Sequence, residues 1–274
     1  MNLKETFKKQ GGIKLLKQYW QGGALFTGIG QFLLLGKSRT ALEILRLSTT
    51  LKTKQKLEKK YNWKLEEFDK TYTEKEHKTS DIIWICWFQG MDNAPELVKK
   101  CYQSVIKNHP DKKVIVLTEK NISDYVTFPE YIMTKWKQGV ITHTHMTDLL
   151  RLELLINYGG LWLDATVLCT GDAPEYFFDS ELFFFQTLKP GRDGHASYIS
   201  SWLMEAKTNN TMWDYFLLHD FMSIVLEKYE EDWKKIIPRD NATPHILLLR
   251  LFDQYDEKTW TAIKSQTQFH KLTY

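Results

Sequence analysis

The sequence predicts an α/β fold with a parallel sheet, and three stretches of the chain carry this prediction. Residues 82 to 88 form a continuous apolar run, which is typical of a strand buried on both faces. A helical pattern then leads to a second apolar run at residues 113 to 118. The third stretch, residues 146 to 170, combines an apolar helix, two glycines and a short strand. Because strand-helix-strand connections are right-handed, a parallel sheet is the expected arrangement.

The chain begins with a basic segment that we expect to be helical, with breaks at Gly11-Gly12, at Gly22-Gly23 and at Gly36 to Ser38. Residues 1 to 64 carry 14 Lys and Arg against 3 Glu, a net charge of +11, and the remainder carries 23 against 31, a net charge of −8. Two interpretations stay open: a peripheral anchor on anionic lipid, or a helical cap that packs on the main domain and keeps its lysines in water. We therefore divide the chain into a basic helical appendage at residues 1 to 75 and a catalytic domain at residues 76 to 274.

Other features of the sequence bear on its location. The longest uncharged run, residues 21 to 36, is shorter than the roughly 20 apolar residues that a membrane-spanning helix requires. Residues 52 to 80 are dense in mixed charge and predict an exposed helix and a linker. No secretory signal pattern begins the chain. The three cysteines are expected to be reduced core thiols of a cytosolic protein that has, at most, a peripheral place on the inner face of the cell membrane.

The main domain continues in a regular order. Pro95 is expected at the start of a helix that ends at the turn before Pro110. Further elements are expected beyond the central stretch: a strand at residues 182 to 186, a helix at residues 211 to 229, a helix that begins near Pro244, and a polar tail.

The stretch from residue 146 to residue 170 holds the expected functional centre. Thr147 is expected to cap the helix, Gly159 and Gly160 to end it, and a strand at residues 161 to 163 to stop at Asp164. In open α/β sheets, ligands bind outside the carboxyl ends of the strands, so Asp164 is placed for function. The alternative is that this carboxylate merely caps a loop.

This stretch also carries a family resemblance. An Asp-x-x-Arg pair at residues 148 and 151, then Tyr-Gly-Gly and Leu-Trp-Leu-Asp-Ala-Thr, resemble the donor-binding core of the capsular polysaccharide synthesis glycosyltransferases, relatives of glycosyltransferase family 32. The resemblance covers roughly residues 81 to 250. It implies a GT-A-like (Rossmann-like) fold, with a mostly parallel central sheet flanked by helices, and a transferase that uses a nucleotide sugar.

The resemblance also implies a metal site of the DXD type. Asp164 would be the first acid of the motif and would contact Mn²⁺ or Mg²⁺ together with the donor. Thr166 stands at the third position, which is usually Asp in the wider family, and a hydroxyl is a poorer ligand than a carboxylate. His245 would complete the metal set, and its alternative role is that of an ordinary residue at a helix start.

The remaining site residues are assigned to the donor. Asp148 and Arg151 look like the family's sugar-recognising pair, and the alternative is an i,i+3 ion pair within the helix. The nucleobase is expected at the side chains of Trp84, Trp87 and Gln89, with core packing of at least one Trp as the alternative. Gly160 is also assigned to donor binding. Histidines 143 and 145 are expected in the loop before the helix. Candidates for acceptor binding are Asp193, His195, His219 and Asp220.

The predicted activity is transfer of a hexose from a UDP-sugar, in preference to a GDP-sugar, to a lipid-linked or growing capsular or exopolysaccharide acceptor, with retention of configuration. The alternative from another class is a noncatalytic protein that binds sugar nucleotides, or a membrane scaffold, with a degenerate DXD motif. Nucleic-acid binding is not expected, because the basic segment holds few aromatic residues and the rest of the chain is acidic.

Overall fold

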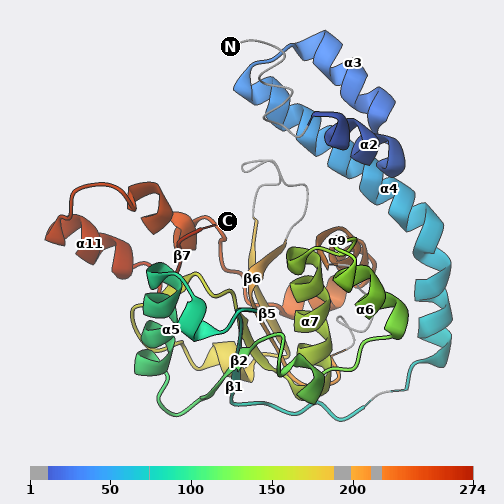
Figure 1. The fold of residues 1–274 in the computed structure, drawn as a ribbon. Coiled ribbons are helices and arrows are strands. Elements are labelled where there is room, and N and C mark those ends of the chain that lie inside the picture. The colour runs from blue at the N-terminus through green and yellow to red at the C-terminus, as the bar shows by residue number, and fades with distance from the viewer. Residues whose placement is uncertain (1–11, 74, 188–198, 211–217, 274) are drawn as a thin grey trace. The chain divides into compact units, whose positions relative to one another are not determined.

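The computed structural model describes residues 12 to 73, 75 to 187, 199 to 210 and 218 to 273 (Figure 1). The chain divides into two compact units, one comprising Met1–Thr73 with Leu188–Tyr198 and the other comprising Glu74–Thr187 with Ile199–Tyr274. The acceptor candidates Asp193 and His195 lie outside the described residues, as do the side chains of His219 and Asp220.

The described part of the first unit consists of helices α2 (Gly12–Gly22), α3 (Leu25–Leu35) and α4 (Arg39–Thr71). Helix α3 packs along α4 (Figure 1), and a Cβ atom at Gly28 would meet the Tyr19 ring of α2 at 3.3 Å and the Thr49 side chain of α4 at 3.4 Å, so this glycine lies where the three helices meet. Ser38 caps α4 by accepting a hydrogen bond from the Ala41 N–H at 3.1 Å. The predicted breaks near Gly22-Gly23 and at Gly36 to Ser38 are confirmed, and α4 covers most of residues 52 to 80, where an exposed helix and a linker were expected.

Several large apolar side chains of this unit are exposed. Leu33 and Leu34 of α3 are exposed by 77% and 82%, and Phe26 by 78%. Within the part of the chain that the structure describes, no helix has both the length and the apolar content to cross a bilayer. The unit therefore presents apolar surface on a helix of only 11 residues.

The second unit is built around a five-stranded sheet in the order β2-β1-β3-β6-β5. Its strands are β1 (Ile82–Cys86), β2 (Lys113–Leu117), β3 (Gly160–Leu163), β5 (Leu182–Gln186) and β6 (Ile199–Ala206). Strand β1 pairs in parallel with β2 and β3, whereas β6 runs antiparallel to both β3 and β5. All strands except β6 therefore run in one direction, and the prediction of a mostly parallel sheet is confirmed.

Helices cover both faces of this sheet (Figure 1). On one face, α5 (Glu96–Asn108) and α8 (Tyr176–Asp179) contribute Val105 and Phe177 to a core cluster that also contains Ile83 of β1. On the other face, α7 (His143–Tyr158) places the Tyr158 ring 5.6 Å from the ring of Trp84. The side chains of successive β1 residues thus pack in the cores on opposite faces of the sheet, which explains why the sequence of β1 is continuously apolar.

The remaining described elements surround this centre. They are the helices α6 (Glu130–Lys137), α9 (Leu218–Lys228), α10 (Glu230–Lys235) and α11 (Glu257–Lys264), the short 3₁₀ helices η1 (Met91–Asn93), η2 (Ile122–Asp124), η3 (Thr243–His245) and η4 (Leu247–Arg250), and a two-stranded antiparallel sheet of β4 (Val167–Cys169) and β7 (Phe269–Lys271).

Two predictions about the end of the chain are wrong. The helix expected near Pro244 is a pair of 3₁₀ helices, and the side chains of Leu249 and Phe252 are exposed by 78% and 96%. Because these two side chains remain in solvent, this end of the apolar run gains little burial to stabilise a longer α-helix. The tail, expected to be polar, contains strand β7, whose residues are buried.

Strand β6 also buries a carboxyl group. Glu205 is 1% exposed and lies opposite Leu161 and Phe183 in the sheet register. Its Oε2 atom has no hydrogen-bond partner among the described residues. Burial raises the pKa of Glu205 to about 9, and the charge of Lys207 offsets only part of this effect. The carboxyl group is therefore neutral at pH 7.

Candidate active site

Helix α7 begins earlier than predicted. Its N-cap is Thr142, whose hydroxyl accepts a hydrogen bond from the His145 N–H at 3.3 Å and lies 2.9 Å from the His145 Nδ1 atom. The prediction that Thr147 is the cap is wrong, because Thr142 already supplies the extended backbone and the hydroxyl that a helix start requires. His143 and His145, expected in a loop, form the first turn of the helix instead.

The two glycines after α7 determine where β3 can run. Gly159 and Gly160 have φ angles of +65° and +93°, which L-residues with side chains rarely adopt. A Cβ atom on Gly160 would lie 2.4 Å from the carbonyl oxygen of Ile82. Gly160 therefore lets β3 come close to β1, and its predicted contact with the donor stays a prediction.

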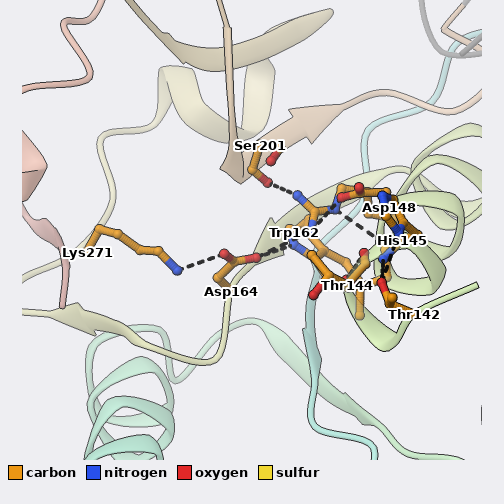
Figure 2. Close-up of polar contacts among 10 residues, drawn as sticks. Thr142, Thr144, His145, Asp148, Trp162, Asp164, Ser201 and Lys271 are labelled. Carbon is orange, nitrogen blue, oxygen red and sulfur yellow. Dashed lines mark hydrogen bonds and ion pairs between the residues drawn. The ribbon is translucent and has the colours of Figure 1, made fainter. Parts of the chain in front are cut away.

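Asp164 follows β3 directly, as predicted, and both of its carboxylate oxygens face cationic groups (Figure 2). Its Oδ1 atom accepts a hydrogen bond from Trp162 Nε1 at 3.1 Å and lies 3.6 Å from Nη2 of Arg151. Its Oδ2 atom accepts a hydrogen bond from Lys271 Nζ at 2.7 Å. The side chain remains 28% exposed, so Asp164 is held in place and is still open to a ligand.

The charges around Asp164 keep it ionised. Burial on its own raises the pKa of Asp164, but the Lys271 ammonium and the Arg151 guanidinium lower the pKa by more than burial raises it. The net pKa of Asp164 therefore lies below the usual value. Asp148 differs, because burial raises its pKa above the usual value against the opposing charge of Arg151. At neutral pH the site therefore contains a firmly ionised carboxylate between two cations.

Arg151 links three elements of the site. Its Nε donates to the Thr147 carbonyl at 3.3 Å, and Nη1 donates to the Ser201 carbonyl of β6. Its Nη2 lies 3.3 Å from Asp148 Oδ1, so the i,i+3 ion pair is present. The guanidinium carbon also lies 4.9 Å from the ring centroid of Trp162. With a side chain only 5% exposed, Arg151 is fixed against the strand that carries Asp164.

Lys271 was not predicted as a site residue. This residue ends β7 and lies opposite Val167 of β4. Its Nζ donates to both Asp164 Oδ2, at 2.7 Å, and Thr166 Oγ1, at 2.9 Å, and its side chain is 7% exposed. The only local signal is the short run from Phe269 to Leu272, which is too brief to predict a strand.

The predicted metal ligands do not fit a divalent ion in this arrangement. Asp164 Oδ2 and Thr166 Oγ1 both accept hydrogen bonds from Lys271. The Nδ1 atom of His245 lies 2.7 Å from the Asn241 carbonyl oxygen, and its ring meets the Trp202 ring edge-on. Among the residues that the structure describes, no three His, Cys, Asp or Glu side chains gather to hold a metal ion.

The residues expected at the nucleobase lie in different surroundings. Trp84 is fully buried and its Nε1 donates to the Gly159 carbonyl at 2.9 Å, so this ring packs in the core, as the alternative stated. Trp87 and Gln89 lie in the loop after β1, at the carboxyl end of the sheet. Trp87 is half-buried, and its Nε1 has no hydrogen-bond partner in the described parts of the chain. Gln89 is exposed.

Burial disfavours the thiolate form of Cys86. Cys86 ends β1, and burial raises its pKa to about 12, although the charge of Arg151 opposes this rise. Cys101 and Cys169 are buried free thiols, in agreement with the prediction.

Two relatives and a solved structure are among the known proteins that this chain resembles. The O-glycosyltransferase braB of Annulohypoxylon truncatum is 35% identical over 97 residues, which is 32% of this chain and 23% of that protein. The O-glycosyltransferase PaGT of Phomopsis amygdali is 24% identical over 157 residues, which is 50% of this chain and 38% of that protein. The matched part thus spans well under half the length of either relative. A solved structure described as PaToxG Glycosyltransferase shares 14% identity and covers 82% of this chain and 95% of its own, with a TM-score of 0.38.

A family model matches far more of the chain. The model, described as "Capsular polysaccharide synthesis protein", matches residues 39–213 and 206–274. These segments include the strand end at Asp164, the helix that carries Arg151, and the strand that carries Lys271. The chain therefore belongs to the capsular polysaccharide synthesis protein family.

Proposed function

We propose that the chain is a glycosyltransferase that moves a hexose from a nucleotide sugar, a UDP-sugar in preference to a GDP-sugar, to a lipid-linked or growing capsular or exopolysaccharide acceptor. Family membership and two relatives named O-glycosyltransferase support sugar transfer. The observation that carries the proposal is Asp164, an ionised and partly exposed carboxylate at the carboxyl end of β3, held by Arg151 and Lys271.

The site suits a nucleoside diphosphate as the leaving group. Negative charge develops on the diphosphate as the glycosidic bond breaks, and fixed cations in a dry site stabilise such charge without reorganisation. Arg151 and Lys271 are nearly buried and lie on either side of Asp164. The exposed side of the carboxylate can accept hydrogen bonds from donor hydroxyls. Trp87 and Gln89 supply the ring and the amide for the base.

We assign retention of configuration to attack by the acceptor on the face from which the diphosphate leaves. The acceptor oxygen bonds to the anomeric carbon, the bond from that carbon to the β-phosphate oxygen breaks, and its electron pair stays on that oxygen. The acceptor proton passes to the departing diphosphate. The raised pKa of Cys86 disfavours a thiolate nucleophile beside this centre, so same-face attack is the simpler course.

The first unit supports peripheral binding to the inner face of the cell membrane. Its helix α3 exposes Phe26, Leu33 and Leu34, and residues 1 to 64 carry a net charge of +11. Apolar side chains beside lysines are typical of helices that lie in the interface of an anionic bilayer. Such binding would bring the second unit close to a lipid-linked acceptor.

A panel of sugar nucleotides tests the activity. We expect the full chain to release the nucleoside diphosphate from one donor in the panel. Asp164→Asn should slow this release at least about a hundredfold, because it removes a charge from the reacting centre, and should leave the circular dichroism spectrum unchanged. Asp111→Asn, at a carboxylate exposed by 69%, is the matched control.

Two outcomes would count against the proposal. Full activity in the Asp164→Asn variant would exclude the assigned role of that carboxylate. Thermal stabilisation by UDP or GDP, with no release from any donor, would favour the alternative of a noncatalytic protein that binds sugar nucleotides.

A further inference from the structure

The Lys271 ammonium lies between the two side-chain oxygens at which the DXD resemblance places a metal ion. Its Nζ is 2.7 Å from Asp164 Oδ2 and 2.9 Å from Thr166 Oγ1 (Figure 2 shows the contact with Asp164). An ammonium group has three N–H bonds, and these two acceptors use two of them. No third acceptor for it is present among the described residues, so one N–H remains for a ligand.

Backbone pairing positions Lys271 beside the Asp-Ala-Thr sequence. Residue 271 pairs with Val167 in the β4–β7 sheet, and the Leu272 N–H donates to the Thr166 carbonyl at 3.1 Å. The strand that follows the Asp-Ala-Thr sequence is thus bonded directly to the strand that carries Lys271. Since the side chain is only 7% exposed, its position is defined by packing and pairing, in contrast to that of a surface lysine.

Thr166 fits an ammonium better than it fits a metal ion. A neutral hydroxyl is a weak ligand for Mn²⁺ or Mg²⁺, which prefer carboxylates, but it readily accepts a hydrogen bond from an N–H group. Lys271 and Arg151 together bring two positive charges to Asp164, as many as one divalent ion carries.

We propose that the Lys271 ammonium replaces the divalent cation of a DXD-type site and binds the diphosphate of the donor, so that donor binding needs no metal ion. This inference rests on the proposed function. In the transfer step, Lys271 keeps its proton and donates a hydrogen bond to the diphosphate oxygen that receives the electron pair of the broken bond. The acceptor proton goes to the departing diphosphate, so the step requires no further reactant.

The test is a calorimetric titration of the full chain with UDP, GDP and inorganic pyrophosphate, each in EDTA and in MnCl₂. Pyrophosphate is included because it reports on the diphosphate site whatever the base. We expect at least one of these probes to bind in EDTA, with a Kd that Mn²⁺ changes less than about twofold. Lys271→Met should weaken binding by about tenfold or more, because it removes a hydrogen bond to a charged group.

Two further variants separate the role of the charge from an effect on folding. Lys271→Arg keeps a cation and should retain most of the affinity. Lys112→Met removes another ion-paired lysine, 16% exposed and 2.6 Å from Asp81, and should bind like the wild type. If Lys271→Met does not fold, the comparison of EDTA with MnCl₂ on the wild type still decides the question.

The possible failures are distinguishable. Wild-type binding that requires Mn²⁺, or a Lys271→Met variant that binds as tightly as the wild type, would overturn the inference and leave the proposed function standing. Absence of binding by every probe in both conditions, together with no donor hydrolysis, would overturn both.

Discussion

Replacing Glu205 with Gln should stabilise the second unit, and the gain should depend on pH. In the folded chain the pKa of Glu205 is raised to about 9, whereas the ordinary pKa of a Glu side chain is 4.5. At any pH between these two pKa values, Glu205 has lost its proton in the unfolded chain but keeps it in the folded chain. The free energy of unfolding therefore falls as the pH rises through this range. At pH 7 the loss covers about 2.5 pH units at about 1.4 kcal/mol each, or roughly 3 to 4 kcal/mol.

Gln has the shape of the neutral acid and cannot ionise, so it removes this loss. Chemical denaturation followed by circular dichroism should show a gain of about 3 to 4 kcal/mol at pH 7, falling below about 1 kcal/mol at pH 5. The lowered pKa of buried His270, about 4, destabilises the fold as the pH falls below 6.5, but it is common to both proteins and cancels. Glu231→Gln, at a side chain exposed by 84%, is the control. An equal gain at pH 5 and pH 8 would refute the reasoning.

Two further predictions concern the other parts of the molecule. Gly160→Ala should lower the free energy of unfolding by about 3 kcal/mol, because it combines an unfavourable φ angle with a clash against the Ile82 carbonyl oxygen of β1. In the same denaturation assay Gly139→Ala, at φ +71° with open space around its added Cβ, should lower it by only about 1 kcal/mol. Equal losses in the two variants would exclude the clash. In liposome co-sedimentation, the double variant Leu33→Ser and Leu34→Ser should bind anionic vesicles less than the wild type, and wild-type binding should weaken as salt is added. Phe252→Ser, which replaces another highly exposed apolar side chain, should bind like the wild type. Vesicle binding that the α3 variant leaves unchanged would contradict the membrane assignment.

The centre of the fold was predictable because its signals are local. The apolar helix, the two glycines and the short strand before Asp164 follow one another directly in the chain, and each has its own sequence signature. The helix start was misplaced because Thr142 and Thr147 are both acceptable caps. Only the backbone path before the helix decides between them.

The composition of the site was less predictable because it depends on distant contacts. Trp84 and Trp87 lie three residues apart in one apolar run, yet one is in the core and the other is half-buried at the sheet edge. Periodicity cannot separate them when a strand is buried on both faces. Lys271 was missed because its role comes from pairing of β7 with β4, and three-residue strands leave almost no pattern in a sequence.

The long separation of Asp164 and Lys271 also bears on how the protein folds. The two residues are 107 positions apart, and closing a loop of that length has a large entropic cost that local contacts do not carry. The helix-turn-strand unit can form early, with Arg151 beside Asp164 on its own. The ammonium reaches Asp164 only when β7 pairs with β4. We therefore expect the charge balance of the site to be completed late in folding, so that a chain with its main sheet assembled need not yet be competent to bind its donor.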